Sequence, residues 1–395
     1  MKNTLTIFLI VLISTIKLSA QLKKEIYNFS SDINSKIEKD TLPWKFQMGA
    51  FDYSFSEYHK KALETWDKNG SGISKISKED SLYFKTFKPQ NAKKYIINRS
   101  KNEQVIIINE AHHNASHRVF TTSLLQGLYD NGYRYFGLEA ISDTLINKRK
   151  FVTNQSGYYT NEPQMANLIH EAAKIGFILF NYEALEGKGG KEREIEEAKN
   201  IAKLIAKNPN SKFLIHCGYE HVVEGTPGNK NWEKAMAGRL KEITKIDPFT
   251  IDQVAYSEKG DVKFNSPYIK MVNSENSVIM IDANDKIFDG GVGNYQTDCR
   301  IIHPVTKYVN DRPNWLSLSG KRKICKISSS KITEYPVLIL AYRINELEQN
   351  GIPADIIEIT NESQTRNLIL DKGTYKIIVK DKNYKIVNEY QQIVN

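Results

Sequence analysis

The stretch VIIINEAHH, residues 105–113, joins four apolar β-branched residues to a polar end with one glutamate and two histidines. A short apolar run of this kind is typical of a strand that is covered on both faces, as in a parallel sheet. The polar end then falls at the carboxyl end of the strand. We therefore take this stretch as the first strand of an α/β core that covers residues 101–345.

The residues that follow alternate between helical and strand-like patterns. Gly132 and Gly176 come directly after two of the helical segments, where glycine commonly ends a helix. Strands that alternate with helices of ten or more residues predict βαβ units and a mainly parallel sheet flanked by helices. The expected strands span 105–108, 133–138, 177–181 and 212–217, and the expected helices span 116–130, 165–174, 192–207 and 232–244.

The two flanking regions have different patterns. Residues 21–100 are polar, rich in aromatic side chains and helix-prone, and 53–66 is expected to form one amphipathic helix that Asn69 and Gly70 end. Residues 346–395 carry short β-rich runs separated by turn residues, which predict a small antiparallel appendage. The expected strands of this appendage span 356–359, 366–370, 375–380 and 386–393.

Residues 1–20 have the pattern of a secretory signal peptide. Lys2 supplies the charge, 5–13 is the apolar segment, and Leu18-Ser19-Ala20 forms a small-residue cleavage site. The apolar segment is short for a membrane span, so an uncleaved anchor is the less favoured alternative. We expect an exported protein, periplasmic or secreted, with no transmembrane segment in the mature chain.

Composition limits the classes of protein that the chain can belong to. Its 395 residues are 40% hydrophobic and 26% charged, which excludes wholesale disorder and fibrous structure. The net charge of +9 comes without a dense stripe of Lys and Arg, so we expect no nucleic-acid partner. Three cysteines cannot pair completely; Cys299 and Cys325 could form one disulfide, or all three could be free.

Ionisable side chains follow each of the four expected core strands. Ligands of open α/β sheets bind outside the carboxyl ends of the strands, so these side chains should meet at one edge. Five of the eight histidines fall within 112–117 and 216–221. His216 lies inside an apolar strand and is read as a core histidine. The residues expected to form one catalytic site are Glu110, His112, Glu139 and His221.

Two kinds of chemistry fit this set of residues. Two imidazoles and two carboxylates suit a divalent metal ion, with His112, His221, Glu110 and Glu139 as its ligands. The same groups also work without metal, because a carboxylate can orient a histidine that acts as general base on water. The spacing does not decide between the two. Residues expected to contact the substrate are His113, His117, Arg118, Glu183 and Arg193.

Several better-known motifs are absent from the sequence. The two principal histidines come from separate loops, so the chain lacks the His-Glu-x-x-His helix of zinc peptidases. It also lacks the Gly-x-Ser-x-Gly elbow of serine hydrolases. The glycine-rich segment 290–293 is not followed by Lys-Ser/Thr, so a turn is a better interpretation than a phosphate loop.

The strand-end residues carry a family resemblance. Asn109-Glu110-Ala111-His112 and Gly218-Tyr219-Glu220-His221 resemble the paired Gly-x-x-His signature of the TIKI/TraB superfamily. The segment 110–117 is most similar to the ChaN-like haem-binding branch, and 136–139 is similar to the erythromycin esterase-like branch. The resemblance covers about 103–245. Asn109 departs from it, because the first motif has glycine at this position.

The resemblance implies two functions of different classes. One is an exported hydrolase that acts on the ester or amide bond of a small-molecule or peptide substrate. The alternative is a non-catalytic protein that binds haem or a metal, with Tyr182 or Tyr219 as a haem ligand. A degenerate fold used for surface binding is a third interpretation. The sequence does not indicate the oligomeric state.

Overall fold

The computed structural model describes residues 25–291 and 296–395. The signal-peptide prediction for residues 1–20 lies outside the described residues, as does part of the glycine-rich segment 290–293. The described part of the chain contains no helix that is both long and apolar enough to cross a membrane. Cys217, Cys299 and Cys325 are all buried and free, so Cys299 and Cys325 do not form a disulfide.

The centre of the molecule is a six-stranded sheet in the order β4-β3-β5-β2-β6-β8, with every neighbouring pair parallel. The predicted α/β fold with a mainly parallel sheet is therefore confirmed. The strands of this sheet are β2 (Val105–Glu110), β3 (Tyr133–Leu138), β4 (Ile178–Asn181), β5 (Lys212–Gly218), β6 (Phe249–Asp252) and β8 (Cys299–Arg300).

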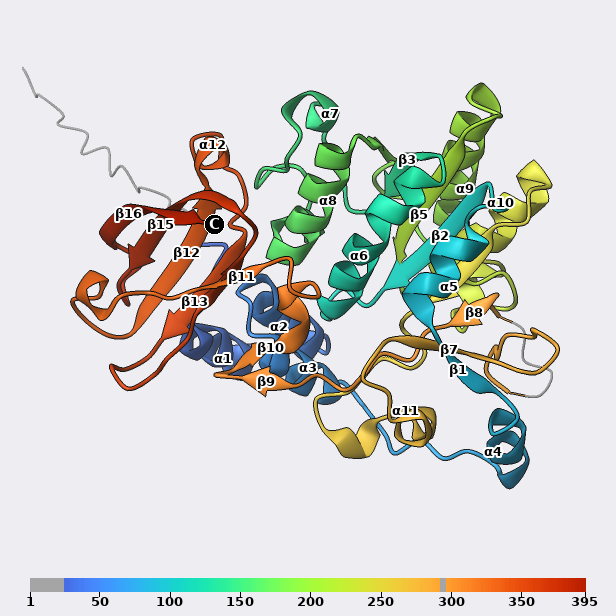
Figure 1. Cartoon of the computed structure of the whole chain (residues 1–395), viewed down its shortest axis with the longest axis horizontal. Coiled ribbons are helices and arrows are strands. Elements are labelled where there is room, and N and C mark those ends of the chain that lie inside the picture. Colours follow the sequence, from blue (N-terminus) through green and yellow to red (C-terminus); the bar gives the residue numbers. More distant parts are fainter. Residues whose placement is uncertain (1–24, 292–295) are drawn as a thin grey trace, which may run out of the picture.

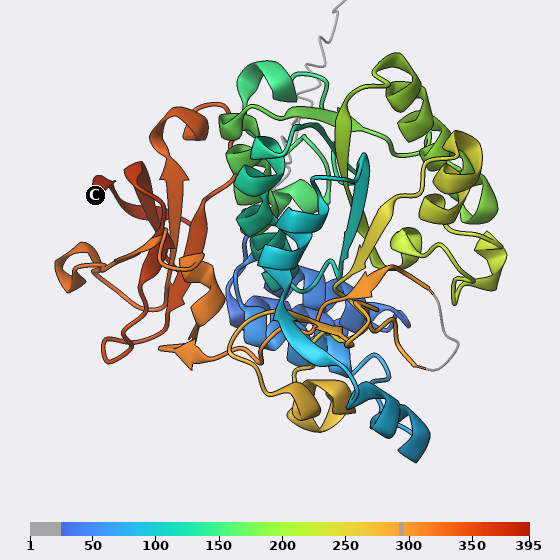
Figure 2. The ribbon, with the colours of Figure 1, turned by 45° about the vertical axis from the view of Figure 1, so that its right-hand side comes forward.

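Helices cover both faces of this sheet (Figures 1 and 2). α5, α6 and α8 pack on one face, where one apolar cluster joins them to β2 and β3. α9 and α10 pack on the other face with a second apolar cluster. The covering helices are α5 (Ala92–Arg99), α6 (Ser116–Asp130), α8 (Pro163–Ile175), α9 (Gly190–Lys207) and α10 (Met236–Thr244).

In the core, the predicted bounds of two elements agree with the observed ones. The helix 116–130 and the strand 133–138 are found at those residues. The first strand runs beyond its predicted end at residue 108, because Asn109 and Glu110 still pair with Cys217 and Gly218 of β5. The polar residues that begin the site are therefore held by sheet pairing.

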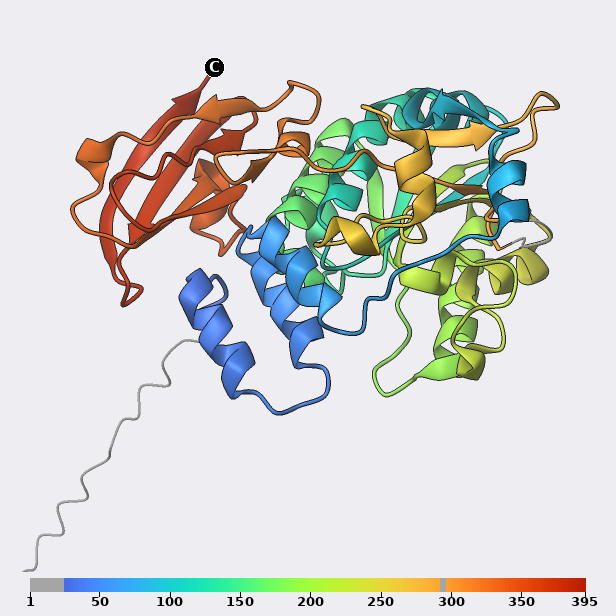
Figure 3. The same cartoon turned by 90° about the horizontal axis from the view of Figure 1, so that it is seen from below.

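The N-terminal region differs from its prediction. The single helix expected over 53–66 is wrong: two helices, α2 and α3, are separated near Glu57, whose φ of 64° lies in the left-handed region. Figure 3 shows these helices on one side of the molecule, next to both the core and the C-terminal sheet. Helices of this region are α1 (Ser30–Lys39), α2 (Lys45–Phe55), α3 (His59–Asp67) and α4 (Lys78–Phe84).

The C-terminal sheet is antiparallel, as predicted, in the order β13-β12-β15-β16. Its strand β12 begins at Val337, ahead of the expected boundary at residue 346, because β12 pairs with β13 and β15. The sheet has its own apolar cluster. Strands of this part are β11 (Lys323–Cys325), β12 (Val337–Arg343), β13 (Asp355–Ile359), β14 (Leu368–Leu370), β15 (Gly373–Lys380) and β16 (Ile386–Val394).

Buried polar contacts join the C-terminal sheet to the N-terminal helices. Arg312 forms an ion pair with Asp355 of β13 and lies 3.6 Å from Glu57 Oε2. Glu57 also accepts a hydrogen bond of 2.8 Å from His59 Nε2. The His59 ring packs against Trp315, with ring centroids 4.7 Å apart. Charged and aromatic contacts therefore connect segments far apart in the sequence.

The remaining elements are short and connect these layers. β1 pairs with β7, and β9 pairs with β10, both antiparallel. These elements are α7 (Ile146–Arg149), α11 (Pro267–Val272), α12 (Ile344–Leu347), β1 (Lys88–Asn91), β7 (Val278–Ile281), β9 (Tyr308–Val309) and β10 (Arg312–Pro313).

Candidate active site

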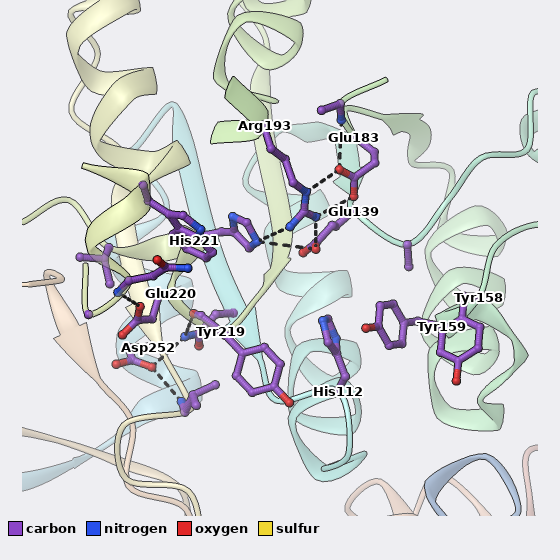
Figure 4. A pocket seen from close by; sticks show the side chains of 18 of the residues that line it. His112, Glu139, Tyr158, Tyr159, Glu183, Arg193, Tyr219, Glu220, His221 and Asp252 are labelled. Atoms are coloured by element: carbon purple, nitrogen blue, oxygen red, sulfur yellow. Dashed lines mark hydrogen bonds and ion pairs between the residues drawn. The ribbon is translucent and has the colours of Figure 1, made fainter. Parts of the chain in front are cut away.

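A pocket of about 1200 Å³ opens at the carboxyl ends of the core strands. Figure 4 shows side chains from several strand ends pointing into it. Its position agrees with the rule that ligands of parallel sheets bind at this edge. Residues that line it include His112, Glu139, Tyr158, Tyr159, Glu183, Arg193, Tyr219, Glu220, His221, Trp232 and Asp252.

His112 lies on one wall of the pocket, directly after β2. Its Nδ1 atom is 2.8 Å from Oε1 of the buried Glu110, so the ring is fixed by a carboxylate behind it. The ring of Tyr159 stacks on the imidazole at 3.8 Å between centroids. An acceptor at Nδ1 places the ring proton there and leaves the lone pair of Nε2 free to accept a proton.

Arg118, on the first turn of α6, holds Glu110 in place. Its Nε and Nη2 atoms donate to the two oxygens of Glu110 at 2.5 and 2.6 Å. Its Nη1 atom donates to Glu162 Oε2 at 2.7 Å. Arg118 is completely buried, and such paired charges are stable in an interior only with satisfied hydrogen bonds. Burial alone would raise the pKa of Glu110, but the charge of Arg118 holds it well below its usual range.

The backbone at Gly218 passes very close to the imidazole of His112. A Cβ atom at this glycine would lie 2.5 Å from Cε1 and 2.6 Å from Nε2 of His112. It would also lie 3.3 Å from Glu139 Oε2. Position 218 therefore has room only for glycine while His112 keeps this position.

Glu139 follows β3 and lies beside Gly218. Its amide donates to His216 O at 3.3 Å, which continues the pairing with β5. Its Oε2 atom accepts from the Gly218 amide at 2.6 Å, and Oε1 accepts from Arg193 at 2.6 Å. Burial alone would raise the pKa of Glu139, but the charges of His221, His112 and Arg193 lower it to about 2. Glu139 is therefore an anion at neutral pH.

Arg193 reaches the pocket from the first turn of α9. Besides Glu139, it donates to both oxygens of Glu183 at 2.8 Å. Its Nη1 atom lies 3.1 Å from Nε2 of His221. Among the described residues, four of its five N–H groups thus have partners, and one N–H of Nη1 remains to donate to a bound molecule.

His221 lies beside Arg193 and Glu139, with His112 below them in Figure 4. Its Nδ1 atom is 2.9 Å from Glu194, and its Nε2 atom is 3.7 Å from Glu139 Oε1. The ring of Trp232 stacks on the imidazole at 4.6 Å. Burial alone would lower the pKa of His221, but the charges of Glu139 and Glu194 raise it.

Asn109 forms the corner between three strand ends. Its side-chain amide donates to Tyr219 O at 2.7 Å and to Asp252 Oδ1 at 2.8 Å. Its Oδ1 atom accepts from the Gln253 amide at 2.7 Å. Tyr219 itself has a φ of 42°, which is unusual for a residue with a side chain and is frequent at functional sites. Where the resemblance has glycine, this asparagine connects the turn after β5 to the end of β6.

The structure brings together five of the nine predicted site residues on the pocket wall. These are His112, Glu139, Glu183, Arg193 and His221. Glu110 lies directly behind His112 and contacts its Nδ1 atom. The predicted residues therefore divide into a group that lines the pocket and a group that lies behind it.

Three predicted substrate contacts need correction. Arg118 is completely buried, because its guanidinium is used by Glu110 and Glu162. His113 is buried under Trp66, whose ring is stacked on it at 3.9 Å between centroids. His117 is buried and accepts the Ala111 amide at 3.0 Å. None of the three lines this pocket.

Other pocket residues escaped prediction. Tyr158, Tyr159 and Trp232 lie in loops or short helical turns that carry no periodic signal.

Two acids behind the pocket, Glu194 and Glu197, did leave a signal in the sequence. They lie on the buried stripe of α9 with Ala198, Ile201 and Ile205, and acids on the apolar side of an amphipathic helix are unusual.

The four residues expected to hold a divalent metal do not fit one in the pocket. Both oxygens of Glu110 already accept from Arg118, and one also contacts His112. The guanidinium of Arg193 lies within 3.1 Å of both Glu139 and His221. A fixed cation between these two groups would repel a second one.

The pocket does not fit haem either. Tyr182, one of the two expected ligands, is buried outside the pocket lining and donates to His216 O at 2.8 Å. Tyr219 does line the pocket, but five carboxylate side chains share that lining. An anionic lining opposes the two propionates of haem, since like charges repel.

Comparisons with known proteins add little to this geometry. No family model matches the chain, and no curated protein matches it. The structure of the type III effector HopBA1 is similar over 38% of this chain and 81% of its own, with 8% identity and a TM-score of 0.29. RRSP, a MARTX toxin effector domain from Vibrio vulnificus CMCP6, is similar over 58% of this chain and 51% of its own, with 12% identity and a TM-score of 0.28. Similarities at these TM-scores carry no statement about activity.

Proposed function

We propose that this chain is a hydrolase of ester or amide bonds in which His112 is the general base. The observation that carries the proposal is the buried series Arg118–Glu110–His112, which fixes the imidazole and leaves Nε2 facing a large pocket. A base oriented by a carboxylate is the arrangement that activates water or a hydroxyl group in many hydrolases.

In the proposed reaction, a water molecule beside His112 attacks the carbonyl carbon of the substrate. Nε2 of His112 takes the proton of this water as the new C–O bond forms. The proton on Nδ1 stays hydrogen-bonded to Glu110, whose charge stabilises the imidazolium. The proton that Nε2 took from the water is then transferred to the leaving alcohol or amine as the C–O or C–N bond of the substrate breaks.

Arg193 is proposed to stabilise the oxygen of the substrate carbonyl. Glu139 and Glu183 fix its guanidinium, and one N–H of Nη1 remains to donate. A donor that is held in place before the reaction stabilises developing negative charge without reorganisation. Glu139 and Glu183 also neutralise the charge of Arg193. We therefore assign Arg193 one hydrogen bond to the substrate oxygen and no further electrostatic contribution.

The pocket volume suits a small molecule or a few residues of a peptide. We also propose that the chain is a divergent member of the TIKI/TraB superfamily, on the strength of the two strand-end motifs. Export to the periplasm or outside the cell remains a proposal that rests on residues 1–20.

The test replaces His112 and measures hydrolysis of a panel of chromogenic esters and peptide amides. We expect His112→Gln to lower kcat/KM by about 100-fold or more, since general-base catalysis contributes that much. His170→Gln is the matched control, because His170 forms a partly exposed ion pair with Glu346 away from the pocket. Full activity of His112→Gln, or no hydrolysis by the wild-type chain, would overturn the proposal.

A further inference from the structure

Behind His221, away from the pocket, lie two acids that the proposed reaction does not use. Glu194 and Glu197 are one turn apart on α9, and the side chains of both are fully buried. Nδ1 of His221 is 2.9 Å from Glu194 and 3.4 Å from Glu197 Oε2. One ligand atom from each of the three residues lies within 4.8 Å of the other two.

The hydrogen bonding of these acids is incomplete. Among the described residues, neither of the Glu197 oxygens nor Oε1 of Glu194 meets the geometry of a hydrogen bond. Arg193 Nε lies 3.0 Å from Glu197 Oε1 and His221 Nδ1 lies 2.9 Å from Glu194 Oε1, so Glu197 Oε2 is the least satisfied of these atoms. Oε2 of Glu194 accepts from the Met236 amide at 2.7 Å. Burying an ionised carboxylate without partners is very costly, so each buried oxygen calls for a proton or a cation.

The charge around these residues is also unbalanced. Glu139 and Glu183 already surround Arg193, whose Nε atom lies 3.0 Å from Glu197 Oε1. One guanidinium thus faces three carboxylates, and Glu194 lies behind His221 as a fourth acid of the group. A second positive charge on the far side of His221 would balance the group without displacing Arg193.

We propose that Glu194, Glu197 and Nδ1 of His221 bind a divalent metal ion of the zinc or manganese class. Two carboxylates and one imidazole are a donor set that such ions accept, with water in the remaining positions. This site differs from the four pocket ligands expected from the sequence, since it uses Nδ1 of His221 and two acids outside that set. It does not depend on the proposed hydrolysis.

A metal ion here would act on the pocket through His221. With the ion on Nδ1, the proton of the neutral imidazole must lie on Nε2. That atom is 3.7 Å from Glu139 Oε1 and 3.1 Å from Arg193 Nη1. Because a protonated Nε2 cannot accept from Arg193, a small ring rotation would exchange this contact for a hydrogen bond to Glu139. His221 would then be a positioning residue that fixes the part of the pocket wall formed by Glu139 and Arg193.

The experiment uses the full chain after dialysis against a chelator. Titration calorimetry with ZnCl₂ and MnCl₂ should show one bound ion per chain. Co²⁺ should replace zinc and give a visible absorption band, which reports ligation directly on the unmodified protein. We expect Glu197→Gln to weaken binding by more than about 100-fold, the upper end for partners that only support a ligand.

Two controls separate the sites. Glu192→Gln changes an exposed acid on the same helix and should leave binding unchanged. His112→Gln should also leave it unchanged, because His112 is not one of the three proposed ligands. Circular dichroism verifies that each variant is folded, and His221→Gln gives a second test if Glu197→Gln is not. Absence of binding by the wild-type chain, or binding lost in His112→Gln but kept in Glu197→Gln, would overturn the proposal.

Discussion

At the residue scale, Gly218 decides how closely the backbone after β5 can approach His112. Its φ of −86° is available to every residue, so the backbone conformation does not require glycine here. The requirement is space, because an added Cβ atom would lie 2.5 Å from the imidazole. The turn after β5 therefore sets the position of a ring that is anchored on β2.

This close approach gives a prediction about Gly218→Ala. The new methyl group must displace the far end of His112, since the backbone is held by sheet pairing. We expect kcat/KM to fall by about 100-fold, the usual effect of misplacing a catalytic group by about 1 Å. The melting temperature should stay within about 4 °C of the wild-type value.

Gly72→Ala is the matched control for this prediction. Gly72 is exposed, and an added Cβ atom would have no neighbour within 4 Å. Its activity should equal that of the wild-type chain. Unchanged activity in Gly218→Ala would mean that His112 does not occupy the described position during the reaction.

At the element scale, the strand ends are joined by side-chain hydrogen bonds as well as by the backbone hydrogen bonds of the sheet. Asn109 contacts the turn after β5, the end of β6 and the residue that follows it. A glycine in its place could make none of these hydrogen bonds. The edge of the sheet that carries the pocket is thus stiffened by one amide group.

We therefore expect Asn109→Ala to lower the free energy of unfolding by about 1–3 kcal/mol. The substitution leaves the buried backbone N–H of Gln253 without its partner and removes one hydrogen bond from Asp252 Oδ1, which keeps those from Val254 and Ala255. An unsatisfied buried donor carries a penalty of about this size. Urea unfolding followed by circular dichroism measures the change. Asn102→Ala, at an exposed position, should change it by no more than about 0.5 kcal/mol. Equal stabilities of the two variants would contradict the prediction.

The secondary-structure elements also show which parts of the fold could be predicted from the sequence. The core helices and strands follow from local periodicity, so α6 and β3 were predicted with their observed bounds. The rule that ligands bind at strand ends correctly led to one edge of the sheet. It correctly placed His112 in the pocket but also expected His113 there, because the sequence does not show which way the folded chain turns two adjacent residues.

Other features needed the tertiary structure. The break between α2 and α3 depends on Glu57, whose buried contacts come from Gln164 and Arg312, far along the chain. Tyr159 reaches His112 from a turn before α8, and no local pattern marks that contact. Side chains that meet only through long-range packing leave no signal in a window of the sequence.

At the scale of the whole molecule, the interior holds an unusual number of neutral histidines. Burial is the main cause that lowers the pKa of His59 to about 3 and that of His216 to about 4. Burial also lowers the pKa values of His113 and His117 well below their usual range. In the unfolded chain each of these imidazoles titrates near a pH of about 6.5.

These shifts predict acid lability. Below a pH of about 6.5 the unfolded chain takes up protons at these imidazoles that the folded chain does not, so their contribution to the free energy of unfolding decreases as the pH falls. Buried acids whose pKa is raised, such as Glu197 and Asp355, contribute in the opposite direction. Each such histidine contributes a slope of about 1.4 kcal/mol per pH unit until its folded pKa is reached. Urea unfolding at a series of pH values between about 7 and 5 measures the slope.

Replacing one of these histidines tests the cause. His216→Gln removes one titrating group, so its stability should decline less steeply with falling pH than that of the wild-type chain. The raised pKa of His221 acts in the opposite direction and adds stability at low pH. The same slope of stability against pH in His216→Gln and in the wild-type chain would contradict the assignment of His216 as a neutral ring.

Three of the four tryptophans lie against imidazole rings, and this gives the molecule an optical property. Trp66 covers His113, Trp232 covers His221 and Trp315 packs on His59. Protonated imidazole quenches indole emission, whereas the neutral ring does so much less. Intrinsic fluorescence should therefore report the charge of histidines in the pocket wall, under the N-terminal helices and beside the C-terminal sheet, without any added dye.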